Sequence, residues 1–468
     1  MISAIRLRSD AWPPFVIGVL AAAIAITPSL PVKLALATLL IALAAITWSA
    51  LRPDRWLVLF FAAALLTPPL PIPLGDSGVH IAPFVALLGL LAAIIRIEEW
   101  RRIPATLGPA FAAFIAILLF SACLAALYSG PSIALGSLFR VALFALSAFV
   151  FWFAAAGPRD RDSDPLRLAK FLFLAAILSA LFGCADFYYQ FPAPAGFEPQ
   201  FVWLDTGTFR RAQGLFYEAS TFGNFCAFFL VMIAVALFRP RAQSPASKPV
   251  LVLGAIVLAA GLILSYSRAS VVNVLVACVA LALVRRVRIG RALLWSLAAA
   301  TAAILLVRFA LPTFSASYWE RLTGSLEFFV ESPNGVLSGR LTNWTLLSGF
   351  LLREPWHAIL GIGYKTLPYS TFAGAKIIAD NTYLSLLAET GIFGLIAFLA
   401  LNAAILREAL RAARSPHPRA AFFGQWIFCF WVGEIVQMLS GDLITYWRVL
   451  PVYFWVLGVA VREAAEPT

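Results

Sequence analysis

Several arginines lie within or beside apolar segments, where a charged side chain is costly. Arg140 lies inside one apolar run, and Arg268 interrupts another within a Ser-Tyr-Ser-Arg turn. Arg210 and Arg211 come just before a third run, and Arg340 begins a short amphipathic pattern. An arginine at membrane depth costs several kcal/mol unless it snorkels, faces water or binds an anion. Guanidinium groups clustered at one membrane face suit a diphosphate, which they bind bidentately, although each arginine taken singly also fits a snorkelling or helix-end role.

Several carboxylates are expected at the same membrane face as these arginines. They show no close Asp-x-Asp pair of the kind that holds a divalent cation. They are Asp186, Glu198, Asp205, Glu218, Glu320, Glu327, Glu331, Asp380, Glu389 and Asp442. We therefore expect metal-independent chemistry. No cofactor is expected either.

Asp380 and Asn381 stand directly before an apolar segment. A carboxylate at this point could accept the proton of an attacking hydroxyl or orient the nucleophile. Both residues are equally consistent with a helix N-cap, where Asp and Asn are favoured. His80 and His357 are alternative bases on the same side of the predicted membrane, whereas His417 lies on the opposite side.

The composition decides which elements position these side chains. The chain has 468 residues, of which 62% are hydrophobic and 12% charged, with a mean hydropathy of +0.89. A soluble chain of this composition could not cover its surface with polar groups. A soluble enzyme, a disordered chain and a disulfide scaffold are excluded. An outer-membrane barrel is also excluded, because the apolar runs are nearly continuous and do not alternate.

The apolar runs predict an all-α, polytopic integral membrane protein with about 14 transmembrane helices. The expected helices are 14–30, 33–51, 56–72, 80–96, 108–128, 134–157, 170–189, 215–238, 249–266, 269–284, 292–311, 382–405, 420–441 and 443–461. The five cysteines, which lie inside these runs without metal-like spacing, are expected to be small hydrophobes.

The basic residues fall in alternate gaps between the expected helices. By the positive-inside rule, the N-terminus and the gap containing the Arg285 cluster are cytoplasmic, and so is the C-terminus. This bias accounts for most of the net charge of +12, so no nucleic-acid partner is needed.

Two long outward connections, 191–214 and 312–381, interrupt the pattern of short links. We divide the chain into N-terminal helices at 1–189, helices with the arginine motifs at 190–311, a large periplasmic loop at 312–381, and C-terminal helices at 382–468. Within the loop, 317–330 and 341–352 have helical apolar spacing, the second through Leu341, Trp344, Leu347 and Leu351. Such helices suit either the membrane interface or a small folded cap.

A series of motifs resembles the O-antigen ligase and polymerase superfamily of bacterial envelope glycosyltransferases. In chain order they are Arg210-Arg-Ala-Gln-Gly-Leu-Phe-Tyr-Glu218, Ser265-Tyr-Ser-Arg268, Ser338-Gly-Arg-Leu-Thr-Asn-Trp344, Leu360-Gly-Ile-Gly-Tyr364, Asp380-Asn-Thr-Tyr-Leu384 and Glu389-Thr-Gly-Ile-Phe-Gly394. The resemblance covers residues 205 to 405 by motif order, and the first half of the chain matches only as a set of helices.

The resemblance implies transfer of a glycan from undecaprenyl diphosphate to an acceptor hydroxyl at the periplasmic face of the inner membrane. Arg211 and Arg268 would hold the diphosphate, and Asp380 would act as base. The motif that reads His-Asn in ligases reads Asp380-Asn381 here, which is more similar to the polymerase branch. The remaining residues expected at the substrate are Arg140, Arg210, Glu218, Arg340 and Asn381.

The favoured interpretation is therefore an inverting, metal-independent polysaccharide polymerase that makes O-antigen or exopolysaccharide. An O-antigen ligase that transfers glycan to lipid A-core is the first alternative, and a lipid-linked oligosaccharide flippase or transporter is the second. The expected partners are the undecaprenyl-diphosphate-linked glycan, the lipid bilayer and other polysaccharide-assembly proteins such as a chain-length regulator.

Overall fold

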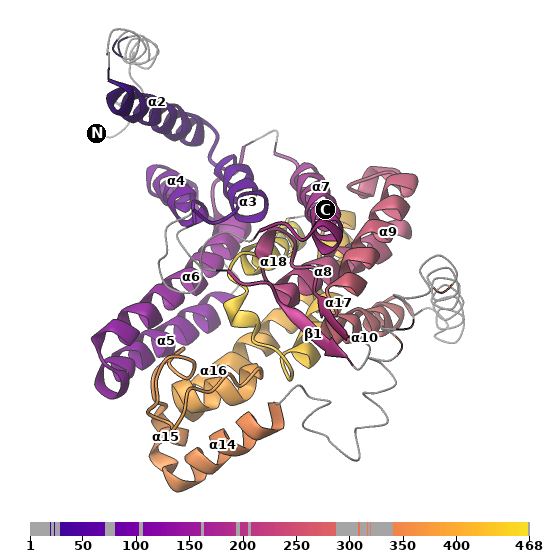
Figure 1. Cartoon of the computed structure of the whole chain (residues 1–468). Helices are drawn as coiled ribbons and strands as arrows, with labels where there is room; N and C mark the ends of the chain where they lie inside the picture. The colour runs from indigo at the N-terminus through magenta and orange to yellow at the C-terminus, as the bar shows by residue number, and fades with distance from the viewer. Residues whose placement is uncertain are drawn as a thin grey trace. The chain divides into compact units, whose positions relative to one another are not determined.

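The computed structural model describes residues 29–70, 80–102, 106–160, 163–192, 197–204, 207–286 and 340–466, with single positions at 19, 23, 308, 316 and 319. In this part the chain is mainly helical (Figure 1). The helices expected at 14–30 and 292–311 and the pattern at 317–330 lie, apart from single positions, outside the described residues.

Apolar sequences form most of the described helices, as the hydropathy pattern predicts. These are α2 (Leu30–Leu51), α3 (Trp56–Leu66), α4 (Ala82–Ile95), α5 (Leu107–Ser129), α6 (Pro131–Ala156), α7 (Pro165–Tyr189), α8 (Ala219–Leu237), α9 (Lys248–Leu264), α10 (Arg268–Val284), α16 (Thr382–Ala413), α17 (Pro418–Gln437) and α18 (Leu450–Ala465). Short 3₁₀ turns are η2 (Ile97–Glu99), η3 (Gly214–Phe216), η4 (Arg241–Gln243) and η5 (Leu443–Thr445). Six of the described helices, α5, α6, α7, α8, α16 and α17, are long and apolar enough to cross a membrane. The chain is thus a multi-pass membrane protein.

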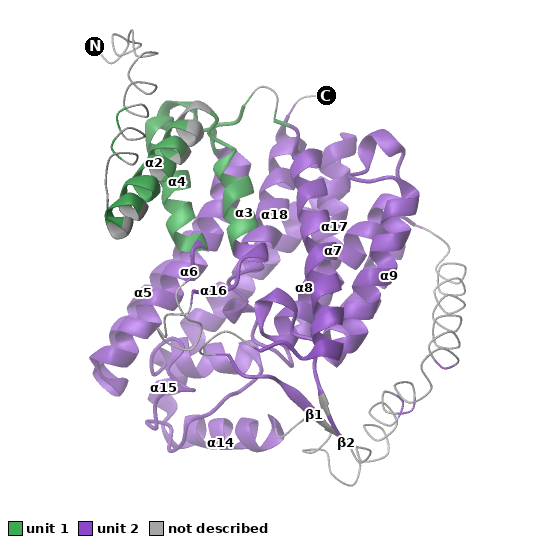
Figure 2. Cartoon of the chain, turned by 45° about the horizontal axis from the view of Figure 1, so that its top comes forward, with its two compact units in different colours: residues 1–63, 82–101, 157–163 green, residues 64–81, 102–156, 164–468 purple. Residues whose placement is uncertain are grey.

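The chain forms two compact units, which Figure 2 shows in different colours. The first comprises residues 1–63, 82–101 and 157–163, and the second comprises residues 64–81, 102–156 and 164–468. Within the first unit, α4 packs closely on the start of α3. A Cβ at Gly89 would lie 2.5 Å from the Trp56 ring, so only glycine allows this approach.

The second unit carries every candidate site residue and has a core rich in aromatic side chains. The Phe228 ring lies 4.6 Å from that of Trp426 and 4.3 Å from that of Tyr453, measured between centroids. Trp426 Nε1 also donates a hydrogen bond to the Phe228 carbonyl at 2.9 Å. Aromatic pairs contribute about 0.5–1.5 kcal/mol beyond the area that they bury, so α8, α17 and α18 are firmly joined.

Two elements correct the sequence-based expectation. The connection 191–214 contains a small antiparallel sheet of β1 (Phe201–Leu204) and β2 (Gly207–Arg210), so the chain is not purely helical. The last helix begins at Leu450 and not at 443, because η5 and a non-helical turn at Tyr446 occupy the start of the expected range. In addition, α3 ends at Leu66, just before two prolines that cannot continue a helix.

The pattern at 341–352 forms α14 (Arg340–Arg353), and α15 (Pro355–Leu360) follows it; both helices lie beside α16 (Figure 1). Leu347 and Leu351 are buried with Ile362 and Ala388 in one apolar cluster. These two leucines therefore face protein and not lipid, and α14 is part of a folded cap over the start of α16.

A break divides α16 at Gly391, which has φ 69° and ψ −174°. The Gly361–Gly363 segment bonds to the carbonyls that precede the break: Ile362 N donates to Ala388 O at 3.0 Å, and Gly363 N donates to Glu389 O at 2.9 Å. Irregular backbone inside a membrane protein persists where protein satisfies its polar groups. These two hydrogen bonds at the break thus hold the segment that leads to Asp380 against α16.

Candidate functional site

The β1–β2 hairpin places Arg211 against the turn between α9 and α10. Arg211 N donates to Gln200 O at 2.8 Å, and Ala212 N donates to Leu264 O at 2.9 Å. The Arg211 side chain makes a further bond from Nε to the Ser265 carbonyl at 2.8 Å. Two motifs that are far apart in sequence are therefore joined directly.

Arg268 is the first residue of α10 and lies immediately after this turn. Tyr266 has a φ of 51°, a left-handed conformation that reverses the chain within a few residues. Ser267 Oγ lies 2.8 Å from Ser270 Oγ, and Gln437 Nε2 of α17 donates to Ser270 Oγ at 3.2 Å. Hydrogen bonds on both sides of Arg268 thus hold the start of its helix.

Asp380 forms an ion pair with Arg340 across the cap. Arg340 Nε lies 3.2 Å from Asp380 Oδ2, and the side chains are 24% and 43% exposed. Trp344 Nε1 donates to Ala379 O at 2.6 Å, and Asn343 Nδ2 donates to Ile378 O at 2.8 Å. Three residues of α14 therefore hold the segment that carries the carboxylate.

Asn381, and not Asp380, caps α16. Its Oδ1 accepts a hydrogen bond from Leu384 N at 3.0 Å, and its φ and ψ are extended. Asp380 has a φ of 46°, in the left-handed region. The sequence left open whether these residues have a chemical role or cap the helix. In the structure Asn381 is the cap, whereas Asp380 pairs with Arg340.

The charges around Asp380 act on one another. Partial burial raises the pKa of Asp380, whereas Arg340 and Arg211 oppose this shift and Asp442 adds to it. Burial also raises the pKa of Glu218, whose carboxylate accepts a hydrogen bond from Thr221. The pKa of Arg211 is lowered by burial, while Glu218 and Asp380 favour its charged form. Arg211, Glu218, Arg340 and Asp380 therefore belong to one charged cluster.

Arg210 lies in a buried ion pair outside this cluster. Its Nη2 donates to both Asp186 carboxylate oxygens, at 3.0 and 3.2 Å, and to the Phe191 carbonyl at 3.0 Å. Both side chains are 7% exposed. Arg210 thus ties the hairpin to the end of α7.

Arg140 of α6 packs against the segment 361–380. Its guanidinium carbon lies 4.4 Å from the centroid of the Tyr369 ring, a cation–π geometry. This contact places Arg140 on the same loop that leads to Asp380.

The histidines considered as alternative bases have other surroundings. The His357 ring stacks on Phe350 at 5.4 Å and meets Tyr128 edge-on at 5.0 Å. His80 Nε2 lies 3.2 Å from Thr67 O, and burial together with the nearby Arg448 charge lowers the pKa of His80 to about 4. His417 accepts from Ala420 N at 3.5 Å as the N-cap of α17.

Two buried cations, Lys365 and Arg448, were not predicted from the sequence. Lys365 follows directly on the Leu-Gly-Ile-Gly-Tyr motif and forms an ion pair with Asp442. Arg448 donates to the carbonyls of Ala64, Thr67 and Leu215 at 2.6 to 2.9 Å. A cation within an apolar stretch is the signal that could have identified both, but their partners are distant in sequence.

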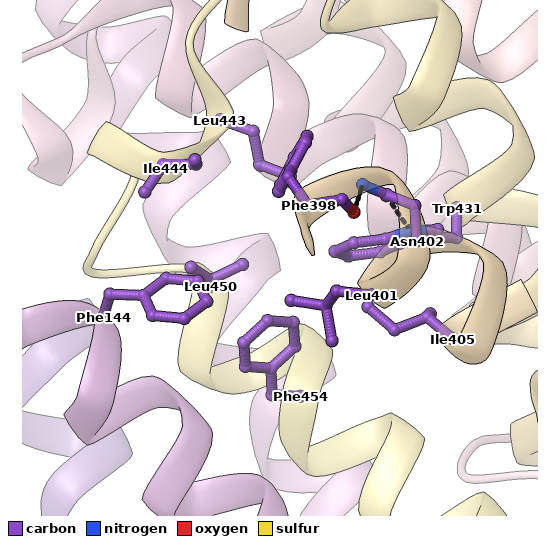
Figure 3. Close-up of a pocket in the computed structure, with 10 residues that line it drawn as sticks. All are labelled: Phe144, Phe398, Leu401, Asn402, Ile405, Trp431, Leu443, Ile444, Leu450 and Phe454. Carbon is purple, nitrogen blue, oxygen red and sulfur yellow. Dashed lines mark hydrogen bonds between the residues drawn. The ribbon is translucent and has the colours of Figure 1, made fainter. Parts of the chain in front are cut away.

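An apolar pocket lies among α6, α16, α17, α18 and η5 (Figure 3). It is lined by Phe144, Phe398, Leu401, Asn402, Ile405, Trp431, Leu443, Ile444, Leu450 and Phe454. Asn402 donates to Phe398 O at 2.9 Å and accepts from Trp431 Nε1 at 2.8 Å, as the dashed lines show. Since no charged side chain lines this pocket, it is chemically distinct from the charged cluster. Among the described residues, no group of three or more His, Cys, Asp or Glu side chains could hold a metal ion.

The apolar helices define a multi-pass membrane protein, and one part of it matches a known family. Residues 253–399 match the family model described as O-antigen ligase. This range includes Arg268, Arg340 and Asp380. The match confirms the resemblance to the O-antigen ligase and polymerase superfamily. No curated protein matches the chain.

Proposed function

We propose that the protein is a polysaccharide polymerase, which joins glycan repeat units carried on undecaprenyl diphosphate at the periplasmic face of the bacterial inner membrane. The observation that supports this most is the hydrogen bond from Arg211 Nε to the Ser265 carbonyl, in the turn that leads to Arg268. It brings together two arginines suited to a diphosphate, and the Arg340–Asp380 pair belongs to the same charged cluster.

In this proposal the arginines act on the leaving group. Breaking the bond between the anomeric carbon and the diphosphate oxygen leaves negative charge on the diphosphate. Preorganised guanidinium groups stabilise that charge more in the transition state than in the ground state. Arg211 Nε donates a hydrogen bond to the Ser265 carbonyl. In this proposal the terminal nitrogens of Arg211 donate to the diphosphate.

Asp380 acts on the acceptor. Its carboxylate takes the proton of the acceptor hydroxyl while the oxygen forms a bond to the anomeric carbon, and this single displacement inverts the configuration. Arg340 favours the ionised form of Asp380 and holds it in place. Asn381 supports the base by starting α16, and Glu218 balances the charge of Arg211.

The polymerase is favoured over the ligase by the Asp380-Asn381 pair, which stands where ligases of the superfamily read His-Asn. The ligase remains the second candidate because the matching family model is described as O-antigen ligase. The two activities use the same donor and differ in the acceptor.

Deletion of the gene, followed by analysis of surface glycan length, separates the candidates. Loss of all chains beyond one repeat unit, with the single unit still exported, supports the polymerase. Full-length chains that remain on the carrier lipid indicate a ligase, and lipid-linked units trapped in the cytoplasm indicate a flippase.

A further inference from the structure

Lys365, which is buried, and Asp442, which is partly buried, form an ion pair between two loops. Lys365 Nζ contacts Asp442 Oδ2, and the two side chains are 7% and 19% exposed. A buried pair is weak support for stability, because its desolvation offsets most of the attraction. Removing only one partner is destabilising, since it leaves an uncompensated buried charge.

Lys365 is held on α16 by the backbone around it. Leu367 N donates to Glu389 Oε1 at 3.2 Å, and the preceding residues 362 and 363 bond to the break in α16. Lys365 itself has a φ of 55°, in the left-handed region that disfavours residues with a Cβ. A glycine would adopt this conformation without cost, so the lysine is present despite local strain.

Asp442 is tied to the segment that follows Asp380 by a different set of hydrogen bonds. Thr382 N and Thr382 Oγ1 both donate to the Gly441 carbonyl, at 3.1 and 2.8 Å. Gly441 directly precedes Asp442, and Thr382 is two residues from Asp380. One of the Asp442 oxygens, Oδ1, is buried and has no hydrogen-bond partner in the described part of the chain.

The charged and titratable groups that act on Asp380 come from several elements. Arg340 belongs to α14, Arg211 follows the hairpin, Glu218 precedes α8, and Tyr446 and Asp442 follow α17. Arg340 and Arg211 favour the carboxylate form of Asp380, whereas Asp442 disfavours it. Lys365 is the cation paired with that opposing carboxylate, and the carboxylate of Glu389 on α16 also interacts with both Lys365 and Asp442.

We propose that Lys365 and Asp442 are a positioning pair, which joins the loop on α16 to the loop beside Asp380 and neutralises the carboxylate of Asp442. This inference rests on the proposed function, in which Asp380 must be ionised to accept a proton. The pair touches neither substrate nor reacting atoms, and it acts through Asp380.

Removing the cation and removing the anion should shift the pH profile of activity in opposite directions. A pair with a purely structural role would not produce these opposite shifts. Lys365→Met leaves the Asp442 anion uncompensated, which favours protonated Asp380, so the acid limb of the activity profile moves to higher pH. Asp442→Asn removes that anion and leaves the Lys365 cation, so the acid limb moves to lower pH. Nearby charges typically shift a pKa by one unit or more, and we expect displacements of about one pH unit.

The measurement uses the full chain in liposomes with an undecaprenyl-diphosphate-linked repeat unit, and polymer formation is followed from about pH 4 to 9. Lys376→Met is the matched control, because Lys376 is an exposed lysine of the same loop. Its acid limb should coincide with that of the unaltered protein. Lys365→Arg, which keeps the charge, should also leave the limb in place.

Opposite displacements of the two limbs support the proposal, and limbs that stay in place or move in the same direction overturn it. If a single variant does not fold, the double variant Lys365→Met, Asp442→Asn replaces it. Its limb should lie within about 0.3 pH units of the unaltered one, because both charges leave together, and a larger displacement overturns the proposal. The remaining single variant must still move its limb in the stated direction, because an unmoved limb there overturns the proposal whatever the double variant does. Asp380→Asn separates failure of the proposed function from failure of the positioning pair. Full activity in that variant refutes Asp380 as the base. If Asp380→Asn is inactive but the acid limbs of the Lys365 and Asp442 variants stay in place, only the positioning pair is refuted.

Discussion

Asp380 and Asn381 are adjacent but have separate structural partners: Asp380 pairs with Arg340 at 3.2 Å, and Asn381 accepts from Leu384 N at 3.0 Å. Because only Asn381 caps the helix, a substitution at Asp380 tests its chemistry without removing the cap.

We expect Asp380→Asn to reduce glycan transfer by roughly 100- to 10,000-fold, the usual effect of losing a general base. The helix should remain intact, since its cap is unchanged. Asn381→Ala should instead lower the free energy of unfolding by about 1 kcal/mol. Transfer assays and thermal unfolding check the two effects. Glu354→Gln, at an exposed carboxylate, is the control, and near-normal transfer by Asp380→Asn would place the base elsewhere.

Arg268→Lys should abolish most of the activity, because an ammonium cannot provide the two parallel hydrogen bonds of a guanidinium. Arg211→Lys should act similarly and also lose the bond from Nε to Ser265. Polymer output per folded protein is the measure, and Arg353→Lys at the exposed end of α14 is the matched control. An Arg268→Lys protein that keeps most of its output would show that Arg268 does not bind the diphosphate.

Arg210→Met should destabilise the protein by about 3–5 kcal/mol, because it leaves Asp186 buried without its cation. Adding Asp186→Leu should recover a large part of this loss. The comparison requires thermal unfolding in detergent and transfer by the folded fraction. Unchanged unfolding with lost transfer would instead indicate that Arg210 contacts the substrate.

His80 should make stability depend on acid. Its pKa in the folded protein, about 4, lies below the ordinary value of 6.5. The unfolded chain therefore binds a proton first, and stability falls as the pH drops from about 6.5 to about 4, by up to about 3 kcal/mol. His80→Gln should remove this part of the dependence. An equal slope for both proteins, measured by tryptophan fluorescence on heating, would contradict the shift.

The proposed orientation predicts that the loop before Asp380 faces the periplasm and the α16–α17 connection faces the cytoplasm. In a cysteine-free background, Lys376→Cys should react with an impermeant thiol reagent in intact spheroplasts, whereas Arg414→Cys should react only after lysis. Both positions are exposed. The reverse pattern would invert the topology and remove the periplasmic site.

Sequence alone predicted the elements whose apolar runs end at clear signals. The expected helix at 134–157 corresponds to α6 within three residues, and 341–352 corresponds to α14 within one residue. The expected end of α16 at 405 was too early, because the helix continues as an amphipathic segment to Ala413 on buried residues such as Ala409. Hydropathy detects apolar runs and misses such continuations.

The site was predictable only in part, for a related reason. Motif order identified Arg211, Arg268, Arg340 and Asp380 as candidates. It could not assign the cap to Asn381, since Asp and Asn cap equally well, nor pair Lys365 with Asp442 across 77 positions. Such pairings depend on how loops dock on the helices, and no local pattern encodes them.

The break at Gly391 also bears on how the protein is made. The carbonyls of Ala388 and Glu389 receive their bonds from Ile362 and Gly363, which leave the ribosome before α16 does. Ser121 of α5, synthesised earlier still, donates to the same Glu389 carbonyl at 2.7 Å. An α16 that kept this break in lipid without the docked segments would carry these acceptors unsatisfied, at a cost of several kcal/mol each. The broken form of α16 is therefore stable only when segments synthesised before it are docked against the break.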